Sequence, residues 1–256
     1  MTVPAWLRPV IILGGLLAIW QAAVAATGVP PFILPSPIAV GRQLLLRWDL
    51  ILPHAGTTLA EIVLGLGLGL VLGVGTALTM AYFRPARRWL LPVLVISQAI
   101  PVFAIAPLLV LWLGYGMPSK VAMAAMIIFF PVTAAFFDGL RRTETGWLDL
   151  AQVMDGGRWA VLRHIRVPAA LPALASGVRV AAAVAPIGAV IGEWVGSRGG
   201  LGYLMLHANA RMQIDLMFAA LFVLAVMAVT LYFAVDALLR RLIPWQPDAL
   251  PADERT

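Results

Sequence analysis

Long stretches of the chain carry no charged side chain, and these stretches predict its helices. Five runs lack Asp, Glu, Lys and Arg, and a sixth, 172–192, contains only Arg179. A charge at the centre of a membrane helix costs about 2.5–3.5 kcal/mol on insertion scales, so such runs are typical of membrane spans. We therefore predict an all-α integral membrane protein with about six transmembrane helices. These helices are expected near 9–27, 57–83, 89–113, 119–138, 173–194 and 215–240.

The first run admits a second interpretation. Arg8, the apolar stretch after it and the small-x-small sequence at 23–25 are also features of a cleaved signal peptide. Because five further spans follow, we favour a retained first helix.

Composition supports a membrane protein with one domain over 1–256. Of the 256 residues, 62% are hydrophobic and 12% are charged, against about 45–50% and 25% in soluble domains. This composition excludes an ordinary soluble globule, a disordered chain and a nucleic-acid-binding module. We therefore expect that the chain lies in a lipid bilayer and binds no nucleic acid. The absence of cysteine excludes a thiolate metal site and a cysteine nucleophile.

The net charge of +6 indicates an orientation in the membrane. With the N-terminus inside, the segments on the inner side hold Arg8, Arg84, Arg87, Arg88, Arg141, Arg142, Arg158, Arg163, Arg166, Arg240, Arg241 and Arg255. Those on the outer side hold Arg42, Arg47, Lys120, Arg198 and Arg211, and Arg179 is left at a helix end. Positive charge concentrates on the cytoplasmic side of membrane proteins, so we predict that both termini are cytoplasmic.

Small residues and prolines predict how the spans pack. The second span has small residues at every fourth position from Gly65 to Ala81, and the fifth has them from Gly177 to Ala189. Such stripes mark close helix contacts, either within the chain, which we favour, or at a subunit interface. Prolines in three consecutive spans predict kinks and a mobile, pore-lining bundle. These prolines are Pro101, Pro107, Pro131 and Pro186.

Catalytic, metal and cofactor motifs are missing from the sequence. It contains no P-loop, no H-E-x-x-H and no G-x-S-x-G, and its histidines, His54, His164 and His207, fall in separate segments. We therefore expect that the chain is not an enzyme and that it holds no metal or cofactor. Most acids near the spans, such as Glu61, sit where they can reach water. Glu193 ends a small-residue stripe, which makes it a site candidate, or alternatively an interfacial acid paired with Arg198.

Two segments outside the spans are longer than simple turns. The outer one, 28–56, starts irregularly because of its prolines, and Ser36 and Pro37 then open a short surface helix through Trp48. The inner one, 138–172, is expected to form two short helices separated at Gly156–Gly157. The second of these helices is expected to end before Pro168. Such a cytoplasmic knob is suited to docking a soluble partner.

The inner segment resembles the "EAA" loop of ABC importer permeases, written E-A-A-x-x-x-G-x9-I-x-L-P. In this comparison Asp149-Leu150-Ala151 takes the place of E-A-A, and Ile165, Val167 and Pro168 match the end of the motif. The motif glycine falls on Asp155, with Gly156 and Gly157 directly after it.

Further segments are similar to the nitrate/sulfonate/taurine class of these permeases. They include Leu34-Pro-Ser-Pro37, Ile100-Pro101, Gly114-Tyr-Gly116 and Gly200-Leu-Gly202. Within that class, the region from Ala185 to Gln213 is most similar to permeases assigned to hydroxymethylpyrimidine, a thiamine precursor.

The resemblance implies a type I ABC importer permease fold in the bacterial inner membrane. It also implies a homodimer of this chain, two cytosolic ATPase subunits that bind ATP and Mg, and a periplasmic or surface solute-binding protein. The ATPase-coupling loop would then contain Asp149, Ala151, Asp155, Gly156, Gly157, Arg158, Arg163 and His164.

Polar and aromatic groups that suit a pyrimidine suggest a substrate pathway. It comprises Gln98, Pro101, Glu193, Trp194, His207 and Asn209. Gln98 could instead bond a kinked backbone, and we favour an aromatic-belt role for Trp194.

Three alternatives stay open: a nitrate, sulfonate or taurine cargo, an ion-coupled secondary transporter, and a membrane-embedded enzyme. No internal repeat supports the second, and only Glu193 and its neighbours offer polar groups for the third.

Overall fold

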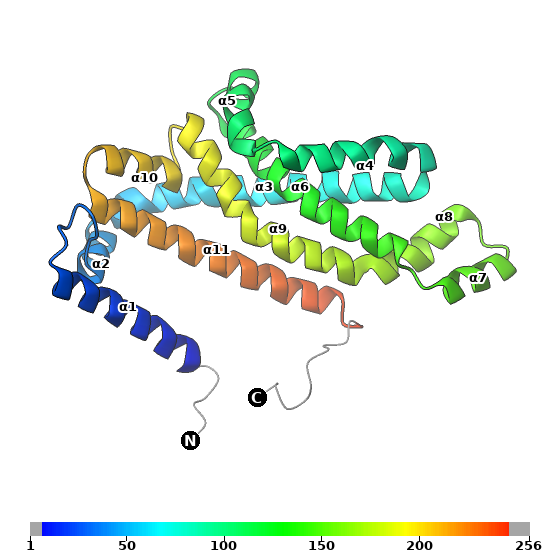
Figure 1. Ribbon diagram of the computed structural model, residues 1–256, viewed down its shortest axis with the longest axis horizontal. Coiled ribbons are helices and arrows are strands. Elements are labelled where there is room, and N and C mark those ends of the chain that lie inside the picture. Colours follow the sequence, from blue (N-terminus) through cyan, green and yellow to red (C-terminus); the bar gives the residue numbers. More distant parts are fainter. Residues whose placement is uncertain (1–6, 246–256) are drawn as a thin grey trace.

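A computed structural model describes residues 7–245, and all regular structure in that range is helical (Figure 1). The helices are α1 (Leu7–Thr27), α2 (Pro37–Leu46), α3 (Trp48–Tyr82), α4 (Arg84–Ala99), α5 (Val102–Leu113), α6 (Met117–Arg141), α7 (Thr145–Val153), α8 (Arg158–Val161), a π-helical turn (Leu162–Arg166), α9 (Val167–Gly196), α10 (Leu201–Ala210) and α11 (Ile214–Leu242). The predicted all-α architecture is confirmed. Arg255, which contributed to the predicted topology, lies outside the described residues.

Helix α6 packs closely against both α3 and α9, and glycine makes this closeness possible. A Cβ added at Gly69 or Gly73 of α3 would overlap a side chain of α6. On α9, a Cβ at Gly177 or Gly188 would come within 2.8 and 2.6 Å of α6 backbone atoms. Both small-residue stripes therefore pack within the chain, and these glycines are not available to a second subunit.

Fewer helices than expected are long enough to cross a membrane singly. Within residues 7–245 four qualify by length and composition, and a fifth crossing is present if α4 and α5 form one broken span. The four are α3, the continuous run 158–196, α6 and α11. The first predicted span corresponds to α1, whose apolar part, Ile11–Thr27, is a shorter helix.

The predicted third span, 89–113, is not one kinked helix. The chain turns by 102° between α4 and α5, and the break falls at Ile100–Pro101. Proline has no N–H and restricts the residue before it to extended backbone, so Ile100 leaves the helix. By contrast, Pro131 and Pro186 lie inside α6 and α9, which continue through them.

Two helix boundaries differ from the sequence prediction. Helix α3 begins at Trp48, nine residues before the predicted start, because Pro53 is tolerated inside it. The helix predicted to stop before Pro168 instead continues into α9 through the π-helical turn, in which the Val167 N–H bonds the Leu162 carbonyl. A π turn shifts the hydrogen-bond register by one residue, so the helix passes the proline without a break.

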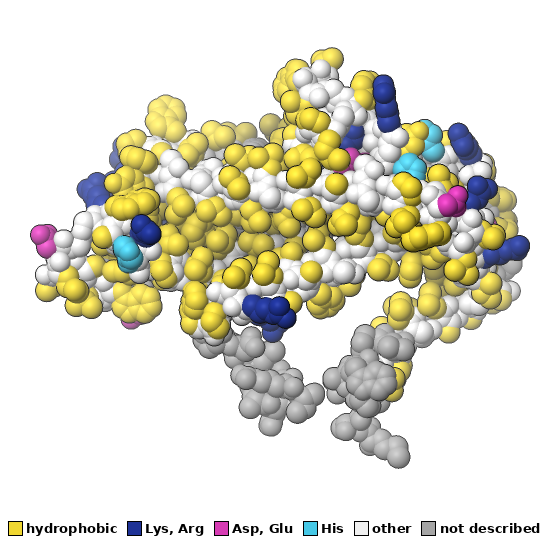
Figure 2. Space-filling model, turned by 180° about the vertical axis from the view of Figure 1, so that it is seen from behind, with side chains coloured by type: hydrophobic (Ala, Val, Ile, Leu, Met, Phe, Trp, Pro, Cys, Tyr) yellow, Lys and Arg dark blue, Asp and Glu magenta, His cyan; other side chains and the backbone are white. Residues whose placement is uncertain are grey.

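The bundle has two distinct ends. Helices α2 and α10 lie at one end, while α7 and α8 project at the other, beyond the end of α11 (Figure 1). Figure 2 shows hydrophobic side chains over most of the middle of one face, with charged side chains mainly toward the ends and the lower edge. This distribution is typical of a protein whose middle faces lipid.

The close packing of α9 on α6 makes Gly188 intolerant of any side chain. Gly188→Ala places a methyl group 2.6 Å from the Cα of Ala124, and overpacking of this kind costs about 1–3 kcal/mol. We expect Gly188→Ala to lower the thermal unfolding midpoint of the purified protein. Gly75→Ala, on an open face of α3, should leave it unchanged or raise it. Equal midpoints for the two variants would contradict this packing.

Candidate functional site

A buried acid holds helix α10 in place at one end of the bundle. The Glu193 carboxylate, on α9, accepts hydrogen bonds from the backbone N–H groups of Gly202 and Tyr203 in the first turn of α10. It also accepts a 2.6 Å bond from the Thr58 hydroxyl, which in turn accepts one from the Leu201 N–H at 2.7 Å. The first N–H groups of a helix have no partner within it and favour a negative charge, so Glu193 caps α10 from outside.

Two further charged residues lie beside Glu193. Glu61 of α3 contacts Glu193, and each of these acids is only 1% exposed. Lys120 of α6 is also buried, and its Nζ donates to the carbonyls of Tyr115 and Gly116 at 2.8 and 2.9 Å. Buried charges need such partners because the interior does not solvate them. We call Thr58, Glu61, Lys120 and Glu193 the buried polar cluster.

The cluster corrects two expectations. Glu61 does not reach water, and the hydrogen bonds of Glu193 go to Thr58 and α10 where a pairing with Arg198 was the alternative. Thr58 was not singled out from the sequence. Lys120 was placed only by its charge, although as the single lysine between two charge-free runs it could have signalled the site.

Two of the three histidines converge, which the sequence did not predict. The ring centroids of His54 and His207 lie 5.9 and 3.9 Å from that of Tyr203, and the Nδ1 of His54 accepts a hydrogen bond from the Gly200 N–H. His164 lies at the opposite end, in the π-helical turn. Within the described residues no group of three potential metal ligands forms.

The structure separates the residues expected in the substrate pathway. Glu193 and His207 both belong to the surroundings of α10, where Asn209 is exposed. Gln98 and Pro101 are exposed at the break between α4 and α5. Just before this break, the hydroxyl of Ser97, the residue next to Gln98, donates a hydrogen bond to the backbone carbonyl of Leu94 at 2.7 Å.

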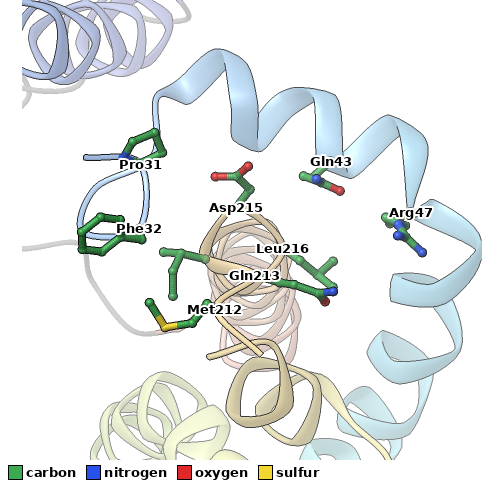
Figure 3. A pocket seen from close by; sticks show the side chains of 9 residues that line it. Pro31, Phe32, Gln43, Arg47, Met212, Gln213, Asp215 and Leu216 are labelled. Carbon is green, nitrogen blue, oxygen red and sulfur yellow. The ribbon is translucent and has the colours of Figure 1, made fainter. Parts of the chain in front are cut away.

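A hollow of about 430 Å³ opens at the same end as α10. Figure 3 shows Asp215 of α11 facing Gln43 and Arg47 across this hollow, with Phe32 on another side. Met212, also in the lining, has φ of +58° at the α10–α11 connection. None of the expected pathway residues lines this hollow.

At the opposite end, α7 stops in a well-formed cap. The Gly156 N–H bonds the Ala151 carbonyl at 2.8 Å, and the Asp155 N–H bonds the Gln152 carbonyl at 3.0 Å. These bonds define a Schellman motif, whose residue after the helix takes a left-handed conformation. Asp155 has φ of +52° and thus occupies this position, which explains why the motif has glycine there.

The projecting pair α7–α8 exposes apolar side chains. Val153 and Met154 are 85% and 74% exposed, and Leu150, Trp147 and Trp159 are exposed as well. Clustered exposed apolar residues mark interaction sites. The projecting pair is therefore suited to contact another protein.

Two clefts bring most of the expected coupling residues together. Ala151 and His164 line an apolar cleft with Trp147. Asp149, Gly156 and Arg158 line a second, polar cleft. The expected coupling residues thus line clefts that lie between α7 and the run from α8 into the π-helical turn.

An ion pair links α9 to α11. The Arg179 Nε lies 2.6 Å from the Oδ1 of Asp236, whose Oδ2 lies 2.9 Å from the Arg240 Nε. Arg179 was expected at a helix end, and that expectation is wrong. It lies well inside α9, where Asp236 compensates its charge.

The family model of the binding-protein-dependent transport system inner membrane component matches residues 65–246, a range that contains α6, the α7–α8 pair and the buried acid Glu193. The chain belongs to this family. This match agrees with the resemblance of the segment 138–172 to ABC importer permeases. The protein is accordingly a permease subunit of an ABC importer.

Three named relatives are more than one third identical to this chain. A probable ABC transporter permease of Haemophilus influenzae is 57% identical over 93% of this chain and 97% of its own. The riboflavin transport permease RibX of Chloroflexus aurantiacus is 40% identical over 90% and 87%. The formylaminopyrimidine transport permease ThiX of Halalkalibacterium halodurans is 36% identical over 94% and 96%.

Similarity to the taurine permease TauC of Escherichia coli, 29% identical over 90% of this chain and 86% of its own, confirms the predicted class. Among solved structures, an inward-facing form of the MetNI methionine ABC transporter aligns with TM-score 0.66. It covers 77% of this chain and 97% of its own at 18% identity, and it confirms the type I permease fold.

The buried polar cluster predicts a specific weakness at α10. Thr58→Val removes the partner of both Glu193 and the Leu201 N–H, and an unsatisfied buried group costs about 1–3 kcal/mol. We expect faster hydrogen exchange at the amides of 201–203, measured by mass spectrometry on the purified permease.

Thr57→Val provides the matched control. Thr57 is half-buried, and its hydroxyl donates to the Pro53 carbonyl in its own helix and not to Glu193 or α10. Exchange that rises equally in both variants, or in neither, would show that Thr58 does not hold α10.

Proposed function

We propose that this permease is the membrane subunit of an ATP-driven importer for a hydroxymethylpyrimidine-type thiamine precursor. Similarity to ThiX, whose name assigns formylaminopyrimidine, supports a pyrimidine cargo. The permease would lie in the bacterial inner membrane, with both of its termini cytoplasmic. ATP and Mg would bind to a separate ATPase chain, and this chain itself would hold no cofactor.

We choose a neutral cargo because two positively charged side chains within the spans, Arg179 and Lys120, already have partners within the chain. Arg179 is paired with Asp236, and Lys120 is buried against two carbonyls and beside two acids. Neither of these two cations is therefore free to attract a sulfonate or nitrate. A neutral solute needs no such charge, since it can be matched by donors, acceptors and aromatic faces. Nitrate, sulfonate or taurine is therefore the second choice.

The α7–α8 pair is the proposed coupling element. Its exposed apolar side chains, Val153 and Met154 among them, offer a contact for a cytosolic ATPase. Movement of α8 would reach α9, because the π-helical turn joins these two in one continuous helix. In the proposed assembly two copies of this chain, two ATPases and one solute-binding protein act together.

The opposite end would receive the solute from the binding protein. The hollow with Arg47 and Asp215 offers charges of both signs for that contact. Among the pathway residues, Gln98, Trp194 and Asn209 are exposed and available to a solute, while Glu193 would act by holding α10. His207 would help to hold α10 by packing its ring against that of Tyr203.

Uptake by the intact complex tests the proposal. The tagged chain would be purified from native membranes with its partners, reconstituted in liposomes and supplied with its binding protein and labelled hydroxymethylpyrimidine. We expect ATP-dependent uptake that excess unlabelled pyrimidine suppresses and excess taurine does not.

Other results would each overturn a distinct part. Uptake of taurine or riboflavin in place of the pyrimidine would replace the cargo but leave the importer. Uptake without an ATPase would indicate an ion-coupled secondary transporter.

The left-handed turn at Asp155 yields a prediction for coupling. A β-branched residue is strained there by about 1–2 kcal/mol, whereas glycine is not. We expect Asp155→Val to reduce ATP-dependent uptake and loosen the binding of the ATPase, and Asp155→Gly to retain both. Recovery of the ATPase with each variant, measured by quantitative mass spectrometry of the purified complex, checks this. Equal recovery and equal uptake would contradict a coupling role for this turn.

A further inference from the structure

A polar cleft lies between the projecting pair α7–α8 and the connection from α3 to α4. It has a volume of about 360 Å³, many times the share of one water in the liquid, about 30 Å³. Its walls come from three parts of the chain: the end of α3 with the start of α4, the last turns of α7, and the run from α8 into the π-helical turn. The cleft is thus lined by elements that are distant in sequence.

Three arginines line this cleft against a single acid. Arg84 begins α4, Arg158 begins α8 and Arg166 ends the π-helical turn, while Asp149 lies on α7. The ion pairs within residues 7–245 are those of Asp236 with Arg179 and Arg240, so the cleft arginines are not paired with Asp149. Three like charges repel one another when no anion compensates them.

Arg166 carries a buried donor that the described part of the chain does not satisfy. Its Nε is buried and has no hydrogen-bond partner within residues 7–245. Native proteins leave few buried donors unsatisfied, and each such donor calls for an unseen water or ion. Because Arg166 lines the cleft, an anion bound there would lie close to this donor.

We propose that this cleft binds a phosphate oxyanion, carried by a lipid headgroup or by a soluble phosphate ester. Arginine presents planar, paired N–H donors that match phosphate geometry. The excess of two positive charges suits a group that carries one or two negative charges.

The position of the cleft favours contact with the membrane surface. Helix α3, an apolar span, ends at Tyr82 in its wall, and Tyr82 packs edge-on against Trp159 at 5.9 Å. Tyr and Trp gather where the hydrocarbon region meets the headgroups. A phosphate held there would tie α7–α8 to the α3–α4 connection.

A phosphate titration tests the proposal on the purified permease, with its co-purifying partners, in nanodiscs of phosphatidylcholine. Inorganic phosphate at constant ionic strength should raise the unfolding midpoint with saturation. Arg84→Gln and Arg158→Gln should each raise the half-saturating concentration about tenfold, the effect of losing one charge-assisted hydrogen bond. Arg88→Gln, an exposed arginine on α4 outside the cleft, should behave as the wild type.

A second arm distinguishes the two sources of phosphate. Nanodiscs that contain phosphatidylglycerol are examined by native mass spectrometry. Retention of that lipid by the wild type and Arg88→Gln, but not by Arg84→Gln or Arg158→Gln, assigns the site to a headgroup. Saturation by inorganic phosphate without lipid retention assigns it to a soluble ester.

Either assignment supports the site. Binding that is equal in all variants, or absent for both probes, overturns it. These outcomes do not depend on which solute the permease carries.

Discussion

The architecture depends on the contact of three helices whose backbones approach closely, α3, α6 and α9. In lipid, apolar surface gains little by leaving its surroundings, so helices associate through close packing and polar contacts. Gly69 and Gly73 on one side of α6, and Gly177 and Gly188 on the other, bring the backbones together. The remaining helices are arranged around this trio, and the two functional ends are the parts of the chain that extend from it.

The two ends differ in how they are held. At the α10 end, buried groups do the holding, because Glu193 and Thr58 satisfy backbone donors that would otherwise be unpaired in the protein interior. At the α7–α8 end, the backbone closes its own cap around Asp155, and apolar side chains remain exposed. One end is thus fastened to the bundle by buried polar groups, while the other projects from it with an exposed apolar surface.

Continuity of the run 158–196 connects these two properties. The π-helical turn lets the projecting helix pass Pro168 and become α9, which carries Gly188 in the core and Glu193 at the far end. A displacement at α8 would therefore reach α10 through one helix. The arginine-lined cleft lies at the start of this path, where a bound anion would restrain α8 against α4.

The sequence by itself determined the membrane character, most of the spans, the two short helices on either side of Gly156–Gly157 and the family. These follow from charge-free runs and local motifs, because lipid excludes charge wherever it occurs and a capped turn is written in adjacent residues. Only the tertiary structure decided that α4 and α5 break apart at Pro101 and that the prolines of α6 and α9 do not break theirs. It alone brought Thr58, Glu61 and Lys120 to Glu193, and Arg84 to Arg158 and Arg166. Such groupings join residues tens of positions apart, and they depend on helix faces and crossing points that no local pattern of residues specifies.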